Sequence, residues 1–294
     1  LVKKYLKGNI CEIGGGQNSV LNKTKNFSKI KNFYCFDKNL KLKKKNKKIK
    51  KINKFFDKNY FKNEKSFSID LLIHSHTFEH LYDPNMFLND VKSILSKNGK
   101  HIFTMPNMRP MIKKGYANAM NFEHPFYYDE KLVDCLLHKN NFKIIKKVFF
   151  KEDHSIMYVT KIDKTLTINS NIKVDKYSEY KKNLKLFQGM FSLWKKDIIK
   201  INKLTKKNKN VFIFGAHIFS QMMIFNGLNS KNLNCVLDND KQKANKFLYG
   251  TNFKIYNPSI LQKISNPCVI LRAGSYNKEI KKQLFEINRN VIIV

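Results

Sequence analysis

Residues 9–16 read Asn-Ile-Cys-Glu-Ile-Gly-Gly-Gly, a mainly apolar stretch that passes directly into three glycines. An apolar run of this length predicts a buried strand, and the glycines after it predict a turn into a helix. Because they lack a Cβ, Gly14, Gly15 and Gly16 let backbone N–H groups and the helix N-terminus approach a ligand closely. The stretch therefore predicts the first βαβ unit of a ligand-binding α/β sheet.

Acidic residues flank this glycine turn at informative positions. Asp37 lies 23 residues after Gly14, at the end of the next apolar run, where a carboxylate accepts the two hydroxyls of a ribose. Glu12 lies two residues before Gly14, and Asp57 follows the third apolar run. These coincidences favour a cofactor site over the alternative, a glycine turn that closes an empty βαβ unit.

Apolar runs alternate with helix-like stretches from residue 9 to residue 162, which predicts a doubly wound domain with a mostly parallel sheet. We expect its seven strands at residues 9–13, 32–36, 49–55, 69–74, 100–104, 142–150 and 155–162. A second βαβ pattern follows residue 209, where Gly215 and Asp238 repeat the spacing of 23. The predicted class is α/β, with a seven-stranded Rossmann-like domain at 1–163, a linker and long helix at 164–208, and a smaller Rossmann-like domain at 209–294.

The long helix is predicted from apolar residues that recur at alternating steps of three and four. This apolar stripe consists of Tyr177, Tyr180, Leu184, Phe187, Phe191, Trp194, Ile198 and Ile201. Two interpretations remain open. The helix packs across the two domains of its own chain, or it forms the seam of a coiled-coil homodimer.

The composition first suggests a nucleic-acid partner, because 57 basic residues face 22 acidic ones and the formal charge is +35. Only three of the basic residues are arginines, however, and the planar guanidinium is the group best suited to phosphate recognition. The Lys/Asn/Ile/Phe usage is also typical of AT-rich coding DNA. We therefore expect a small anionic acceptor rather than a nucleic acid.

The five cysteines are scattered without a CxxC pair, which fits reduced thiols in a cytoplasmic protein. They argue against a zinc module, and the sequence predicts no metal site. No apolar stretch is long enough to suggest a membrane span.

Further motifs follow the glycine turn in a fixed order. After Glu12-x-Gly14-x-Gly16 come Asp37, Asp57, Ser68-Ile69-Asp70-Leu71-Leu72, the run HTFEHLYDP at 76–84, and LSKNG at 95–99. This series resembles the class I S-adenosylmethionine-dependent methyltransferases. A hydride-transferring dehydrogenase is the competing interpretation, but the third spaced glycine of its fingerprint is missing.

The resemblance implies S-adenosylmethionine as the cofactor. Its methionine end would face Gly14 and Gly16, its ribose Asp37 and its adenine Asp57. The resemblance further places Glu12, Gly15, Ser75 and His76 in the cofactor site.

The segment Asn121-Phe122-Glu123-His124-Pro125-Phe126-Tyr127-Tyr128 follows the fifth strand, on the rim where such folds place acceptors. Methyl transfer needs an aligned acceptor and usually a proton acceptor, and an imidazole suits the second task. The segment resembles that of sugar-nucleotide methyltransferases, which implies His124 as the base, with Glu123 and Tyr127 or Tyr128 assisting. In the alternative interpretation the aromatic residues are core and His124 caps the next helix.

The second half resembles the smaller C-terminal domain of the same relatives, although most of its glycines are lost. The relatives' zinc module is missing, and Asn121 takes the place of their catalytic tyrosine. We therefore expect O-methylation of a carbohydrate, or of its nucleotide-activated or phosphorylated precursor, in surface-glycan synthesis. The alternatives are sugar C-methylation, RNA methylation that uses the basic run at 41–54, and a non-catalytic partner subunit.

Overall fold

The computed structural model describes residues 2–16, 19–39, 46–62, 67–121, 123–150, 153–166 and 175–294. The chain divides into two compact units, and each is considered by itself. Unit 1 comprises Leu1–Met108 and Phe122–Lys176, and unit 2 comprises Arg109–Asn121 and Tyr177–Val294. Of the predicted linker, residues 167–174 lie outside the described residues, as do residues 41–45 of the basic run.

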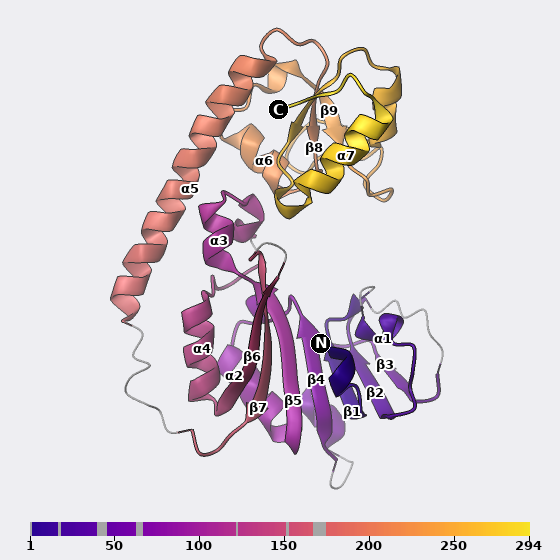
Figure 1. The fold of residues 1–294 in the computed structure, drawn as a ribbon, viewed down its shortest axis with the longest axis vertical. Coiled ribbons are helices and arrows are strands. Elements are labelled where there is room, and N and C mark those ends of the chain that lie inside the picture. The colour runs from indigo at the N-terminus through magenta and orange to yellow at the C-terminus, as the bar shows by residue number, and fades with distance from the viewer. Residues whose placement is uncertain are drawn as a thin grey trace. The chain divides into compact units, whose positions relative to one another are not determined.

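Unit 1 contains a seven-stranded sheet in the order β3-β2-β1-β4-β5-β7-β6 (Figure 1). All neighbours pair in parallel except β7, which runs antiparallel to both β5 and β6. The strands are β1 Gly8–Ile13, β2 Ile30–Phe36, β3 Ile49–Ile52, β4 Ile69–Ser75, β5 Leu95–Pro106, β6 Phe142–Phe150 and β7 Ser155–Ile162. The predicted α/β class is confirmed, with β3 shorter and β5 longer than expected.

Both faces of this sheet are buried. Ile10 and Cys11 are neighbours in β1 yet belong to different core clusters, and so do Leu71 and Leu72 in β4. Successive side chains of a strand point to opposite faces, so two cores require apolar residues at consecutive positions. This is why the strands are recognisable as continuous apolar runs.

The helices of unit 1 begin where the sequence supplies caps. Asp83 Oδ1 accepts a hydrogen bond from Met86 N (2.8 Å) at the start of α2, and Asp129 Oδ1 accepts one from Leu132 N (3.1 Å) at the start of α4. The helical elements up to residue 139 are η1 Val2–Tyr5, α1 Val20–Lys23, η3 Lys58–Phe61, η4 Phe78–His80, α2 Pro84–Ile94, α3 Met108–Lys113, η5 Ala117–Met120 and α4 Glu130–Lys139.

Two histidines lie side by side in the core of unit 1. His74 and His101 are essentially inaccessible to solvent, and their Nε2 atoms are 2.9 Å apart. One Nε2 must donate and the other accept, so the accepting ring is neutral. Burial lowers the pKa of His74, as does the neighbouring His101, and burial lowers the pKa of His101 to about 3.

We expect this pair to make the protein acid-sensitive. Below about pH 6.5 the unfolded chain protonates both rings while the folded chain does not, so stability present above that pH is lost as pH falls. The cost at pH 5.5 is about 1.4 kcal/mol for each histidine. Urea unfolding at pH 8 and pH 5.5 should show a smaller loss for the double variant His74→Leu, His101→Leu than for wild type or His138→Ala. Equal losses in all three would contradict it.

Unit 2 contains a parallel five-stranded sheet in the order β10-β9-β8-β11-β12. Its strands are β8 Val211–Phe214, β9 Leu233–Leu237, β10 Ile255–Tyr256, β11 Cys268–Leu271 and β12 Ile292–Ile293. Its helical elements are α3 and η5 from the segment 109–121, α5 Lys176–Thr205, α6 Ile218–Phe225, η7 Ser230–Asn232, η8 Pro258–Lys263, η9 Gly274–Tyr276 and α7 Asn277–Ile287. The predicted second Rossmann-like sheet is confirmed. The two-residue strand β10 is too short to produce a pattern.

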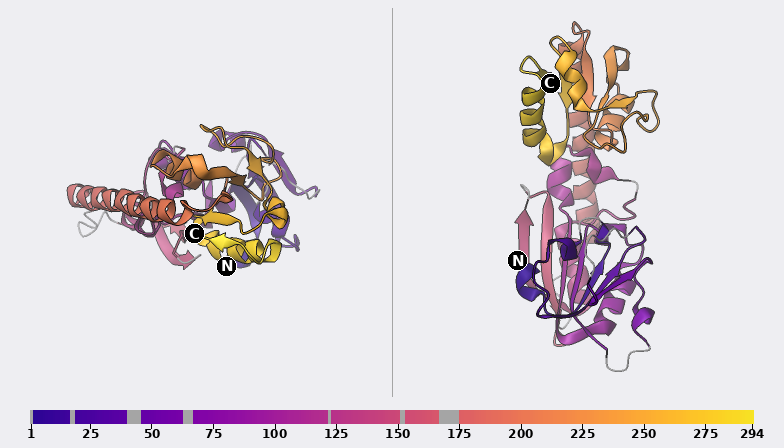
Figure 2. Two further views of the ribbon diagram at one scale, coloured as in Figure 1. Left: turned by 90° about the horizontal axis from the view of Figure 1, so that it is seen from above. Right: turned by 90° about the vertical axis from the view of Figure 1, so that its right-hand side faces the viewer.

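The predicted long helix is α5, which Figure 1 and the left view of Figure 2 show as one long helix. Its stripe divides into two parts. Trp194, Ile198 and Ile201 are buried in unit 2, whereas Tyr177 and Tyr180 are exposed. Trp194 Nε1 donates to Gly115 O (2.7 Å), which ties the segment 109–121 to α5. None of the helices in the described part of the chain is apolar enough over a sufficient length to cross a membrane.

Candidate functional site

The glycine turn lies at the carboxyl end of β1. Gly14 and Gly16 have φ values of +68° and +48°, which side chains rarely adopt. A Cβ on Gly14 would lie 2.7 Å from Thr77 Oγ1, so the turn also packs closely against the segment after β4. Gly14 is therefore required for both conformation and space, and Gly16 for conformation.

Glu12 is buried behind the turn rather than presented at its surface. Its carboxylate accepts hydrogen bonds from Ser19 Oγ (2.5 Å) and Val20 N (2.7 Å). Burial raises the pKa of Glu12, although the hydrogen bonds from Ser19, Val20 and Cys35 oppose this shift. Through these contacts Glu12 holds the start of α1 against β1 and shapes the glycine turn.

The two expected nucleoside-binding aspartates follow β2 and β3. Asp37 Oδ2 accepts a hydrogen bond from Gly16 N (2.8 Å), and Asp37 Oδ1 accepts one from Asn39 N (2.6 Å). Asp57 is exposed, and its Oδ1 accepts from Asn59 N (2.8 Å) at the start of η3. Asp37 is therefore fixed directly beside the glycine turn.

Ser75 and His76 end β4 at the same edge of the sheet. Strand register pairs Ile13 with both Phe36 and His74, so the ends of β1, β2 and β4 are level. Ser75 Oγ lies 2.7 Å from Thr104 Oγ1, and both Ser75 and His76 are exposed. This edge, outside the carboxyl ends of parallel strands, is where doubly wound sheets bind ligands.

His124 lies in the loop between η5 and α4 and packs against a second histidine. The rings of His124 and His80 are 4.8 Å apart, edge to face, and His80 Nδ1 donates to the Glu123 carbonyl (3.0 Å). Burial lowers the pKa of His124, against the opposing effect of Glu79. The imidazole is therefore neutral at neutral pH and has a lone pair available for a proton.

The aromatic residues after His124 divide between core and surface. Tyr128 is buried, whereas Phe126 and Tyr127 are partly exposed. Burial raises the pKa of Tyr127, so its hydroxyl stays protonated at neutral pH. The cap of α4 is Asp129, which contradicts the alternative that His124 caps this helix.

Two protein families match the chain and together span it. A methyltransferase domain family matches residues 2–147, and a C-methyltransferase C-terminal domain family matches residues 147–292. The chain belongs to the class I S-adenosylmethionine-dependent methyltransferases. It is therefore an enzyme, and its cofactor is S-adenosylmethionine.

Solved structures similar to this methyltransferase cover slightly more than half of it. A putative type 11 methyltransferase from Sulfolobus solfataricus is 19% identical over 57% of this chain and 92% of its own, with a TM-score of 0.41. A putative S-adenosylmethionine-dependent methyltransferase from Listeria monocytogenes is 11% identical over 55% of this chain and 96% of its own, with a TM-score of 0.43. None of the curated proteins matches the sequence.

The residues at the edge of the unit 1 sheet fit this cofactor. The glycines of the turn leave its backbone uncovered by side chains, and Asp37 presents a carboxylate at the end of β2. These groups suit a zwitterionic amino acid and a ribose, respectively. When bound there, the cofactor would supply an electrophilic methyl group. The chain's own residues would orient the acceptor and take up its proton.

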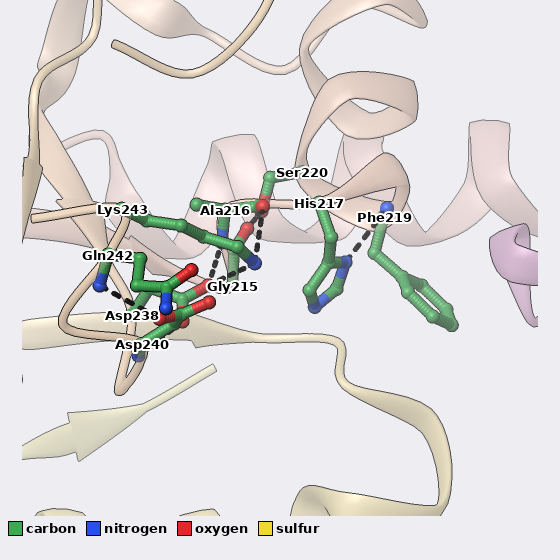
Figure 3. A network of polar contacts seen from close by, with 9 residues as sticks. All are labelled: Gly215, Ala216, His217, Phe219, Ser220, Asp238, Asp240, Gln242 and Lys243. Carbon is green, nitrogen blue, oxygen red and sulfur yellow. Dashed lines mark hydrogen bonds and ion pairs between the residues drawn. The ribbon is translucent and has the colours of Figure 1, made fainter. Parts of the chain in front are cut away.

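Unit 2 of the methyltransferase repeats the turn but fills it with its own side chains (Figure 3). Ala216 N donates to Asp238 Oδ2 (2.7 Å), which matches the bond from Gly16 N to Asp37. Here, however, Lys243 Nζ donates to both Ala216 O (3.1 Å) and Asp238 Oδ2 (3.3 Å). Burial would raise the pKa of Asp238, but the backbone N–H donors and Lys243 outweigh it and lower the pKa. At the second turn, the charge of Asp238 is therefore balanced by Lys243 of the same unit.

Sequence reasoning did not assign roles to Glu79 and His80, although both lie in the quoted run at 76–84. They lie in η4, after β4. His80 contacts Glu123 and His124, and Glu123 lies 43 residues later in the sequence. The position of the run at the end of a strand was the available signal. It indicates proximity to the site but does not identify the partner loop.

Proposed function

We propose that this enzyme transfers the methyl group of S-adenosylmethionine to a hydroxyl of a carbohydrate, or of its nucleotide-activated or phosphorylated precursor. Residues 1–163 would carry the chemistry, residues 164–208 would link the domains, and the smaller domain at 209–294 would support acceptor binding. The pairing of a methyltransferase domain with a C-methyltransferase C-terminal domain supports methyl transfer, and the carbohydrate acceptor rests on sequence resemblance. The resemblance of residues 121–128 to sugar-nucleotide methyltransferases supports the same class.

The observation that carries the mechanism is the neutral, half-buried imidazole of His124, in the same compact unit as the glycine turn. An acceptor hydroxyl that attacks the methyl carbon becomes more acidic as its new bond to carbon forms. His124 would take this proton at its unprotonated ring nitrogen. Glu123 and Tyr127 would help orient the acceptor, Tyr127 as a hydrogen-bond donor.

Transfer to carbon is the second candidate, because the family at residues 147–292 is described as a C-methyltransferase domain. A base of lowered pKa is better matched to a hydroxyl, whose proton leaves during transfer, than to an unactivated C–H bond. For this reason the hydroxyl stays the first candidate.

Incubation with methyl-labelled cofactor and a panel of nucleotide sugars, phosphorylated sugars and RNA tests the acceptor class. We expect label in a sugar derivative, with transfer to RNA at background. Label confined to RNA, with binding that weakens steeply as salt rises, would replace this proposal with the nucleic-acid alternative.

The same reaction run in D₂O separates the two bond types. O-methylation leaves every carbon-bound proton of the sugar in place, whereas C-methylation exchanges or loses the proton of the attacked carbon. Product NMR is expected to show a methoxy signal and unchanged ring protons. A carbon-bound methyl group next to an exchanged position would establish C-methylation instead.

A further inference from the structure

Glu79, His80 and His124 bring three metal-binding side chains together in unit 1. One ligand atom from each lies within 4.8 Å of the others. Around a tetrahedral ion with bonds of 2.0–2.1 Å, ligand atoms are roughly 3.3 Å apart. Closing by at most roughly 1.5 Å, the difference between these separations, would therefore place three ligands around one ion and leave the fourth position open.

The hydrogen bonds around the cluster leave the lone pairs that a metal needs. A carbonyl cannot donate, so the 3.0 Å contact to Glu123 O fixes the proton of His80 on Nδ1 and leaves Nε2 bare. This arrangement, a ring N–H donated to a backbone carbonyl, is the usual outer support of a metal-binding histidine. His80 is therefore already held in the tautomer that binds metal.

Glu79 and His124, the other two members of the cluster, each have a buried polar atom without a hydrogen-bond partner among the described residues. Glu79 is 3% exposed, and its Oε1 accepts from His76 Nδ1 (3.2 Å). Its Oε2 has no hydrogen-bond partner among the described residues, and neither does His124 Nδ1. Buried polar atoms are normally paired, so two unpaired polar atoms in one cluster indicate a missing ligand.

We propose that Glu79, His80 and His124 bind a divalent first-row transition metal such as Zn²⁺ or Co²⁺. Two imidazoles and one carboxylate favour these ions over Mg²⁺ and Ca²⁺, which prefer oxygen ligands. The proposal departs from the sequence-based expectation of no metal site, because the ligands come from two separate loops without a spacing motif. It shares His124 with the proposed function but does not depend on methyl transfer.

Titration of the chelator-treated, full-length protein with Co²⁺, followed by its visible absorption bands, tests the site without any activity. We expect one saturable equivalent that Zn²⁺ displaces and excess Mg²⁺ does not. His80→Ala and Glu79→Gln should weaken binding more than about 100-fold, and His76→Phe, which removes the support of Glu79, about 10- to 100-fold. His138→Ala is the matched control and should bind as wild type does.

Absence of stoichiometric binding to wild type, or equal affinity in His80→Ala with its circular dichroism spectrum unchanged, would overturn the metal site. A separate arm addresses the base. Neutral imidazole has one lone pair, so a metal on His124 should inhibit methyl transfer over the same concentration range that develops the Co²⁺ spectrum. Metal binding without inhibition would contradict the role of His124 as base and leave the metal site standing.

Discussion

Replacing His124 with alanine is expected to reduce kcat for methyl transfer by about 10²- to 10⁴-fold while leaving the affinity for S-adenosylmethionine nearly unchanged. The imidazole lies in the loop between η5 and α4, whereas the expected cofactor residues follow β1, β2, β3 and β4. Removing the ring therefore removes the proton acceptor without changing the glycine turn. Single-turnover transfer and calorimetry on the same preparation measure the two quantities.

The pH dependence of the wild type gives a second readout of this residue. Burial lowers the pKa of His124 below its usual 6.5, so activity should be constant at neutral pH and fall only as the pH drops below 6.5. His138→Ala, a substitution on α4, is the control and should preserve both rate and profile. Full turnover by His124→Ala, or an acid limb above pH 7, would refute the assignment.

Substitution of Asp37 by asparagine is expected to weaken cofactor binding by about 1.5–3 kcal/mol, the usual value of a hydrogen bond to a charged group. This corresponds to roughly 10- to 150-fold in Kd. The carboxylate both accepts from Gly16 N and stands where the ribose hydroxyls are expected. The loss should appear in the Kd measured by calorimetry, with little change in kcat at saturating cofactor.

The second unit supplies a matched control for this experiment. Asp238 accepts the corresponding hydrogen bond from Ala216 N, so Asp238→Asn makes the same chemical change at the same kind of turn. We expect it to lower the melting temperature but to leave cofactor affinity unchanged. If Asp238→Asn weakens binding as much as Asp37→Asn, the cofactor has been assigned to the wrong turn.

Most of the architecture could be predicted because two-sided burial leaves a strong pattern. The strands of unit 1 bury consecutive residues, as Leu71 and Leu72 illustrate, and each of the seven was expected near its observed position. Strand β10 has two residues and no pattern of its own. The segment at 109–121 clusters with unit 2 through contacts such as that of Gly115 with Trp194, which no local signal encodes.

Less of the site could be predicted from the sequence, because the contacts in it depend on the orientation of individual side chains. The family resemblance placed Glu12 at the cofactor, but its carboxylate lies behind the turn and accepts hydrogen bonds from Ser19 and Val20. The contact of His80 with His124 joins two loops far apart in the sequence. A sequence motif predicts which edge of the sheet carries the site. Which residues contact one another at that edge is known only from the fold.

The most direct test of the account is calorimetry with the intact chain and S-adenosylmethionine. The geometry of Gly14, Gly16 and Asp37 predicts a single site per chain, whose affinity is weakened in Asp37→Asn and retained in Asp238→Asn. Absence of any binding up to millimolar cofactor would contradict the account, since neither the methyl transfer nor the role of His124 could then stand.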